Sequence, residues 1–269
     1  MKLVKTTTAL LCVLSLTVIS CKKNVKDVQQ EEISQETLTK IYNHGFGTSN
    51  VQRTEDGYLV EGDIVLTEEF LNGKPGGTFL RIANNEQYRT NNLVTGLPRT
   101  VKVALDNKLA AKAGYSLALT EMANRYNAQN LSLTFSVVSS GADITFSNAN
   151  GNYLASAGFP TSSGLPYNQV KVNSRAIGTG TSTTFVNYLA TILAHEAGHC
   201  IGFRHTDYMD RSFSCGGSTA NEGASTVGAV HIPGTPTTAD SGSWMLACIG
   251  SGVNRPFNNN DKTALGYLY

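Results

Sequence analysis

The sequence is poor in charged residues, which make up 15% of its 269 residues. Neither sign dominates, since 21 basic and 20 acidic residues give a formal net charge of +1. This balance supplies no basic field for a polyanion, so we expect no nucleic-acid partner. The 41% of hydrophobic residues suffices for a sizeable buried core.

Long apolar runs are also scarce. The run from Ala9 to Ile19 is too short to span a bilayer stably, and it follows Lys2 and Lys5. A positive start before a short apolar run predicts an export signal over residues 1–20. Val18-Ile19-Ser20-Cys21 resembles a bacterial lipobox, in which the cysteine is acylated. The alternative is a plain secretory signal with an incidental cysteine at Cys21.

The polar residues 21–35 are predicted to be a tether behind the lipid-bearing Cys21. In the lipobox resemblance, Lys22 after the cysteine favours the outer membrane. We therefore expect an exported protein that is anchored by lipid at the bacterial outer membrane or cell surface, with release of the mature domain left open.

Histidine is rare, with five in the chain, yet three lie in one stretch that reads H-E-x-x-H-x-x-G-x-x-H. Residues four apart on a helix share a face, so His195 and His199 can point at one position. Gly202 allows the helix to end and the chain to return, so His205 can supply a third ligand. Three histidines with one open position are typical of a catalytic zinc ion.

Glu196 lies beside the predicted open position. Zinc lowers the pKa of a bound water to about 7, and Glu196 can take its proton as the water attacks a peptide carbonyl. The same carboxyl can then protonate the departing amine. H-E-x-x-H alone also occurs by chance on solvated helices, but the five fixed positions argue against chance. The sequence thus predicts a zinc-dependent endopeptidase with one catalytic Zn2+.

The extended motif resembles the metzincin clan of zinc endopeptidases, which carries a methionine turn downstream of the third ligand. Met245 is the candidate, as an apolar floor beneath the zinc and not a ligand; the alternative is an ordinary core methionine. The astacin and serralysin branches place a tyrosine two residues later, where this chain has Ala247. Tyr208 is either a substitute for that tyrosine or a packing residue.

Four segments together resemble the dual-action HEIGH metallopeptidases of bacteria, namely residues 198–208, 214–217, 232–236 and 243–248. The resemblance implies an α+β, metzincin-like domain over residues 84–269, with a twisted mixed sheet, an active-site helix and a C-terminal subdomain carrying the Met-turn. The residue pattern predicts strands over 101–105, 132–138, 143–146 and 169–173, and helices over 111–127 and from Thr183 or Thr184 to Ile201. Residues 153–160 are either an exposed edge strand that pairs with an extended peptide substrate or a surface loop.

A proregion over residues 36–83 is predicted to precede that domain. A helix is predicted to begin at residues 34–38, at the start of this region. The region also contains an alternating strand from Tyr58 to Leu66 and the flexible stretch 72–77. Residues 60–66 resemble the aspartate-switch segment of astacin propeptides. This resemblance implies that Asp63 occupies the open zinc position until the chain is cut. The alternative is a turn residue with a local hydrogen bond.

Of the five cysteines, Cys200, Cys215 and Cys248 remain in the predicted domain. Two should pair in an exported protein, but three connectivities are possible. Cys200 is one residue from His199 and points about 100° away around a helix, so we expect no zinc role for it.

A second functional class stays open, a surface-anchored binding or adhesion protein that retains zinc without turnover. Glu196 argues against it, because a binding site has little need of a carboxylate beside the open position. A nonpeptidic zinc hydrolase is a third possibility. No recognisable pattern encodes the cleavage preference or the physiological target.

Overall fold

The computed structural model describes residues 32–73, 87–217, 229–236 and 240–269. The fold belongs to one compact unit, residues 33–269. The predicted signal 1–20, Cys21 and most of the predicted tether fall outside the described residues, as do residues 74–77 of the flexible stretch. Within the described ranges, no helix combines the length and apolar character that a membrane crossing requires.

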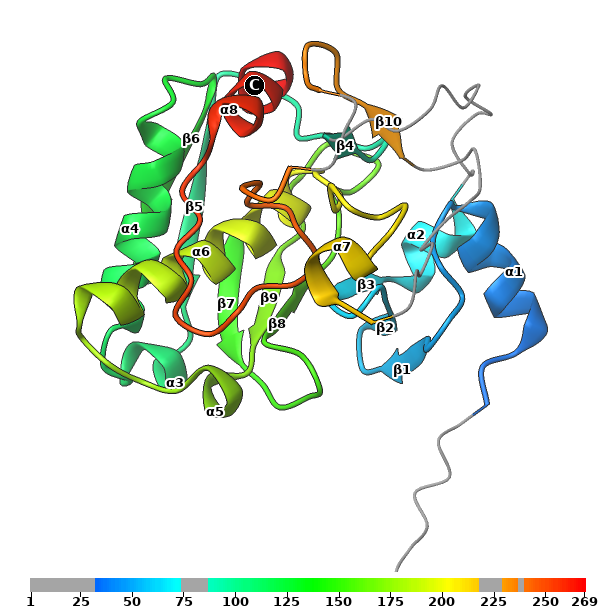
Figure 1. Cartoon of the computed structure of the whole chain (residues 1–269), viewed down its shortest axis with the longest axis horizontal. Coiled ribbons are helices and arrows are strands. Elements are labelled where there is room, and N and C mark those ends of the chain that lie inside the picture. Colours follow the sequence, from blue (N-terminus) through cyan, green and yellow to red (C-terminus); the bar gives the residue numbers. More distant parts are fainter. Residues whose placement is uncertain (1–31, 74–86, 218–228, 237–239) are drawn as a thin grey trace, which may run out of the picture. The chain divides into compact units, whose positions relative to one another are not determined.

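A mixed eight-stranded sheet forms the centre of this unit, in the order β1-β2-β3-β8-β9-β7-β5-β6 (Figure 1). The strands are β1 (Gln52–Thr54), β2 (Gly57–Val60), β3 (Ile64–Leu66), β5 (Arg99–Leu105), β6 (Leu133–Val137), β7 (Ile144–Asn148), β8 (Ala155–Ala157) and β9 (Gln169–Val172). Strands β9, β7, β5 and β6 run parallel, whereas β8 is antiparallel to β9. A small antiparallel pair joins β4 (Tyr88–Arg89) to β10 (Val230–His231). The predicted α+β class with a mixed sheet is confirmed.

The parallel strands have one buried and one open face. Along β5, Val101 and Val103 are fully buried, while Thr100 and Lys102 are exposed. Helices α4 (Tyr115–Asn127) and α6 (Thr183–Cys200) pack against each other and against this sheet. This alternation is what a strand with one covered face requires.

The predicted helix 111–127 starts later, at Tyr115, as α4, and a separate short helix, α3 (Asn107–Ala110), precedes it. They are separated at Gly114, whose φ of 88° is a left-handed conformation. A Cβ at Gly114 would lie 1.9 Å from the carbonyl oxygen of Gly180, so this close approach needs glycine. The prediction from apolar spacing was wrong about this helix's start because the backbone approach is a tertiary contact.

Helix α6 lies where the active-site helix was predicted. It begins after Ser182, whose hydroxyl accepts the backbone N–H of Phe185, and it ends at Cys200. All its residues from Tyr188 to Cys200 are buried. Its C-terminal half is therefore fixed by packing, and this half carries two of the predicted metal ligands.

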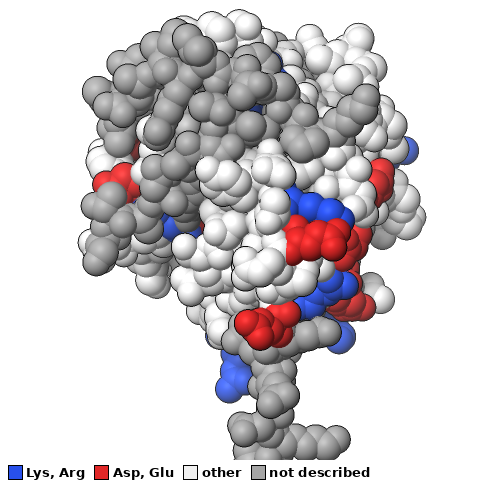
Figure 2. Space-filling view, turned by 90° about the vertical axis from the view of Figure 1, so that its right-hand side faces the viewer, with Lys and Arg blue, Asp and Glu red and all other residues white. Residues whose placement is uncertain are grey.

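The N-terminal segment, residues 33–73, builds a satellite core of its own. It comprises α1 (Gln35–Asn43), strands β1 to β3 and α2 (Glu68–Asn72). A small apolar cluster including Ile41, Phe46 and Leu66 fills it, and Phe159 from the main part of the fold joins that cluster. Acidic and basic side chains are interspersed on the face shown in Figure 2.

The predicted strand Tyr58–Leu66 is interrupted at its middle. Strand β2 ends at Val60 and β3 starts at Ile64, and the two pair antiparallel. Between them Glu61 and Gly62 adopt positive φ angles of 51° and 88°. This tight reversal ends the alternation, so the uninterrupted strand is a wrong prediction.

Residues 153–160 do contain a strand, β8, but its outer edge is not free. Strand β3 lies parallel to it with Ile64 opposite Ala157, and the backbone N–H of Ala157 donates to the carbonyl of Asp63 over 2.9 Å. The predicted exposed edge is therefore covered in this structure by the N-terminal segment.

The C-terminal part of the chain wraps back over α6 by way of loops and ends in α8 (Asn259–Leu268) (Figure 1). A capping box between Asn258 and Asp261 starts α8. The remaining short helices are α5 (Ser174–Ile177) and α7 (Ser212–Cys215). A disulfide joins Cys215 to Cys248, and Cys200 is a buried free thiol. This resolves the three connectivities that the sequence left open.

Candidate active site

The three histidines of the motif converge at the C-terminal end of α6. His195 and His199 lie on one face of the helix, and the chain then turns at Gly202, with φ of 111°. A Cβ there would lie 2.7 Å from the Leu93 side chain and 3.0 Å from the backbone oxygen of Asn92. Glycine is thus required for the turn that returns His205 to the site.

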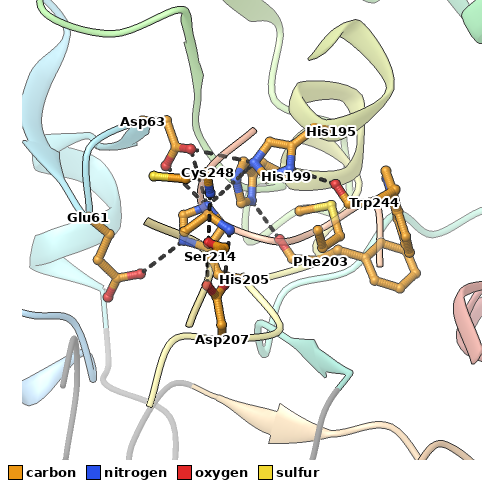
Figure 3. Close-up of polar contacts among 12 residues, drawn as sticks. Glu61, Asp63, His195, His199, Phe203, His205, Asp207, Ser214, Trp244 and Cys248 are labelled. Atoms are coloured by element: carbon orange, nitrogen blue, oxygen red, sulfur yellow. Dashed lines mark hydrogen bonds and ion pairs between the residues drawn. The ribbon is translucent and has the colours of Figure 1, made fainter. Parts of the chain in front are cut away.

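The histidine Nε2 atoms face one another (Figure 3). The Nε2 of His199 lies 3.1 Å from that of His195 and 3.2 Å from that of His205. The Nδ1 atom of His195 donates to the Trp244 carbonyl over 2.9 Å, and Nδ1 of His199 donates to the Phe203 carbonyl over 2.8 Å. These outer bonds fix the tautomer and leave the Nε2 lone pairs directed inward.

These distances fit a tetrahedral metal ion. Zinc binds imidazole nitrogen at about 2.0–2.1 Å, which places neighbouring ligand atoms about 3.3 Å apart. His195, His199, His205 and Asp63 each offer one ligand atom, and these atoms all lie within 4.8 Å of one another. All four residues are buried. Nitrogen lone pairs that face one another at such short range need a shared cation, so the donor set suits a metal.

Asp63 reaches this centre from the reversal between β2 and β3. Its Oδ2 lies 3.2 Å from Nε2 of His205 and 3.4 Å from Nε2 of His195. Burial alone would raise the pKa of Asp63, but the charge of His205 and the close approach of the His195 and His205 rings hold it well below its ordinary value. The carboxylate therefore lies ionised at the fourth corner of the cluster.

Glu196 lies on α6 beside His195 and is 3% exposed. Burial raises its pKa well above the ordinary value, and the negative charge of Asp63 adds to this, while His205 opposes it. Its Oε2 has no hydrogen-bond partner in the part of the chain that the structure describes. A small cavity of about 230 Å³ adjoins it, lined among others by Ile192, Ala155 and Leu246.

The turn containing Met245 packs against α6. A Cβ at Gly198 would lie 2.6 Å from the Met245 sulfur, so the methionine is seated against the helix backbone. The neighbouring Trp244 supplies the carbonyl that accepts the His195 proton. Asp261 on the C-terminal helix α8 accepts hydrogen bonds from the backbone N–H of Trp244 and from the hydroxyl of Ser243.

Tyr208 does not lie among the metal-facing groups. Its ring packs edge-on against Tyr88, with ring centres 4.5 Å apart, and also faces Arg204. The site's remaining wall is braced by Asp207, which accepts the N–H of Ala247 and the hydroxyl of Ser214 (Figure 3). Tyr208 is thus placed as a packing residue, the second of the two roles considered for it.

Sequence reasoning missed Arg204 and Glu61. The guanidinium of Arg204 is fully buried and donates from Nη2 to Glu61 Oε1 over 2.8 Å. The second oxygen of Glu61 lies 3.9 Å from Nδ1 of His205. The two residues are 143 positions apart, and nothing local in the sequence marks them as partners. An arginine inside the zinc motif offers a weak signal at most, because arginines usually lie on the surface.

Comparison with solved structures gives weak similarity. The structure of myroilysin aligns at a TM-score of 0.30 with 17% identity, over 44% of this chain and 54% of that chain. The GM1-bound form of the ECX AB5 holotoxin aligns at 0.32 with 18% identity, over 53% and 66%. The chain thus spans less than two thirds of either. No curated protein matches it.

A family comparison covers much more of the chain. The model of the dual-action HEIGH metallo-peptidases matches residues 59–269, which include the Asp63 reversal, the histidine cluster and the Met245 turn. This match spans well over half of the sequence, and the protein accordingly belongs to the dual-action HEIGH metallopeptidase family.

Proposed function

We propose that this metallopeptidase is an exported zinc endopeptidase with one catalytic ion. The observation that carries the proposal is the convergence of three inward-facing Nε2 atoms beside the buried carboxyl of Glu196. His195, His199 and His205 would hold the metal. When bound, zinc would lower the pKa of water toward about 7 and polarise the substrate carbonyl.

Glu196 would act as the general base and then as the acid. Its Oε2 has no partner among the described residues, so it is open to accept a proton from the attacking water. The same carboxyl would return that proton to the leaving amine. An extended peptide would pair with the backbone of β8 by strand addition, once that edge is vacated.

The test compares Glu196→Gln with wild type. The amide has nearly the same shape but cannot take a proton, so we expect zinc to stay at about one ion per chain while peptide hydrolysis is lost. Glu121→Gln is the matched control, because Glu121 lies on α4 and pairs with Arg125. Undiminished hydrolysis by Glu196→Gln would rule out Glu196 as the base, whereas zinc binding without any hydrolysis by wild type would favour the alternative of a binding protein.

We further propose that Asp63 keeps the enzyme latent. Two observations support this: its carboxylate lies at the fourth corner of the histidine cluster, and β3 covers the edge of β8 that a peptide substrate would use. A carboxylate oxygen binds zinc at about 2.0–2.2 Å, so the ligand type is suitable. Cleavage between about residues 73 and 87 would release the segment.

Latency is tested by comparing unprocessed wild type with unprocessed Asp63→Ala. We expect the variant to hydrolyse peptides before cleavage and the wild type to do so only afterwards, with equal activity once the segment is gone. Equal activity of the two unprocessed proteins, followed by equal activation, would show that Asp63 is not the latch.

Membrane attachment through Cys21 is the third part of the proposal, and the lipobox-like Val18-Ile19-Ser20-Cys21 supports it. Acyl chains on one cysteine would anchor the domain by a polar tether. Radiolabelled palmitate should appear on wild type and not on Cys21→Ala. Label on both proteins or on neither would reject the assignment.

A further inference from the structure

The side chain of Arg204 forms a carboxylate site next to the metal centre. Its guanidinium is completely buried, donates to Glu61 through Nη2 and to the carbonyl of Gly45 through Nη1, and lies 4.1 Å above the ring of Phe46. Within the described ranges, Glu61 is the single carboxylate that contacts it. Glu61, Gly45 and Phe46 all belong to the N-terminal segment, whereas Arg204 lies one residue before the metal ligand His205.

The charge of Arg204 is balanced by a residue of the N-terminal segment. A buried arginine is tolerated when a hydrogen-bonded carboxylate compensates it, and it is costly when that partner is removed. Release of residues 33–73 would leave the guanidinium beside the ring of Tyr208, 5.3 Å from the ring centre. A cation would then border a site built for a doubly charged ion, and this combination attracts an anion.

The present occupant uses only part of the guanidinium. Glu61 Oε1 contacts Nη2, but Glu61 Oε2 is directed toward Nδ1 of His205 at 3.9 Å, and Nε of Arg204 has no hydrogen-bond partner among the described residues. Arginine binds carboxylates best through two parallel N–H donors. A carboxylate that is free of the constraint at Asp63 can use both Nη2 and Nε.

We propose that Arg204 is the core of a carboxylate-binding site, filled by Glu61 in this structure and by a carboxylate of the substrate once the N-terminal segment is displaced. The ligand is an acidic side chain or the free C-terminus of a peptide. The substrate part of this inference rests on the proposed peptidase function, whereas the binding site itself does not.

The site can be tested on the full chain without any activity. Glu61→Ala removes the atoms that acetate contains, so acetate should refill the gap beside Arg204. In metal-free protein we expect Glu61→Ala to unfold several degrees below wild type and acetate to raise its Tm saturably. Neutral acetamide and chloride at equal concentration should not do so, nor should acetate on Glu61→Ala combined with Arg204→Gln. Equal shifts with acetate and acetamide, or no shift with either, would overturn the site.

The substrate preference is tested with full-length protein incubated with zinc until activity appears. Pairs of peptides carry Glu or Gln at the same position and are otherwise identical. At one such position near the cleaved bond, the Glu and Gln peptides should differ in kcat/KM by about 10- to 100-fold, the range expected for a hydrogen-bonded charge. Paired peptides with free and amidated C-termini show which carboxylate is bound. Arg204→Gln should remove the difference in kcat/KM between the Glu and Gln peptides, whereas the exposed Arg175→Gln should keep that difference.

Each outcome of the peptide test has one meaning. Hydrolysis without any carboxylate preference would overturn the substrate assignment. A complete lack of hydrolysis would count against the proposed function, and the acetate experiment would still decide whether Arg204 binds carboxylates. If Arg204→Gln does not fold, the Glu and Gln peptides with wild-type protein settle the preference.

Discussion

Replacing Asp261 by alanine tests how the C-terminal helix holds the turn that carries Met245. Asp261 is fully buried and accepts four hydrogen bonds. The donors are Nε2 of Gln87 at 2.7 Å, the hydroxyl of Ser243 at 2.9 Å, and the backbone N–H groups of Asn258 at 3.0 Å and Trp244 at 3.2 Å. One side chain therefore ties together three parts of the chain.

The expected loss of stability follows from the donors that alanine leaves unpaired. Gln87, Ser243 and Trp244 are each at most 1% exposed, so water cannot readily replace the carboxylate. Each buried donor without a partner costs about 1–3 kcal/mol, although Gln87 keeps a second bond to Ser243. We expect the free energy of unfolding to fall by about 3–5 kcal/mol, a large part of the 5–15 kcal/mol typical of a domain.

The measurement is urea denaturation of metal-free protein, with Lys262→Ala as control. Lys262 is the exposed neighbour of Asp261 on α8 and should change stability by no more than about 0.5 kcal/mol. Zinc affinity should also fall in Asp261→Ala, because Trp244 carries the carbonyl that orients His195. A stability loss below about 1 kcal/mol would refute the view that this hydrogen-bond network anchors the turn.

Three further predictions concern charge, covalent linkage and metal binding. Burial, partly offset by its hydrogen bonds, raises the pKa of Asp261 from 3.8 to about 6, so between these pH values the folded protein binds a proton more tightly than the unfolded chain. The unfolding free energy of wild type relative to Asp261→Asn should therefore fall by up to about 3 kcal/mol as the pH rises from about 4 to about 6. Denaturation of metal-free protein at successive pH values measures this difference. A rise of the difference with pH would contradict the expected direction. Replacing Cys215 and Cys248 together should cost about 4 kcal/mol, because their bond closes a loop with a separation of 33 residues; the cost should vanish when both proteins are compared in reductant. His199→Ala should lose stoichiometric zinc by elemental analysis, and full retention would overturn the ligand set.

The active-site helix and its ligands could be predicted because their signals are local. The spacing of His195 and His199 and the glycine at 202 act within a few residues of one another, whereas the cap is Ser182 and not the predicted Thr183 or Thr184. Such contacts are encoded in sequence periodicity and in backbone preferences. The structure places these residues where that spacing requires.

Other features depend on partners far along the chain, and no periodicity reports them. The pairing of β3 with β8, the contact of Arg204 with Glu61 and the choice of Cys215 as partner of Cys248 are all of this kind. The C-terminal helix is different, because the Asn258 and Asp261 spacing that caps it was present in the sequence and was overlooked.

The reversal between β2 and β3 concentrates three unlike contacts in four consecutive residues. Glu61 holds Arg204, Asp63 faces the histidines and Ile64 lies opposite Ala157 in the sheet. Because these residues are joined by so few rotatable bonds, a backbone movement that breaks one contact also displaces the other two. Release should therefore be all-or-none, with a population of chains that is either fully closed or fully open and few partly opened molecules between them.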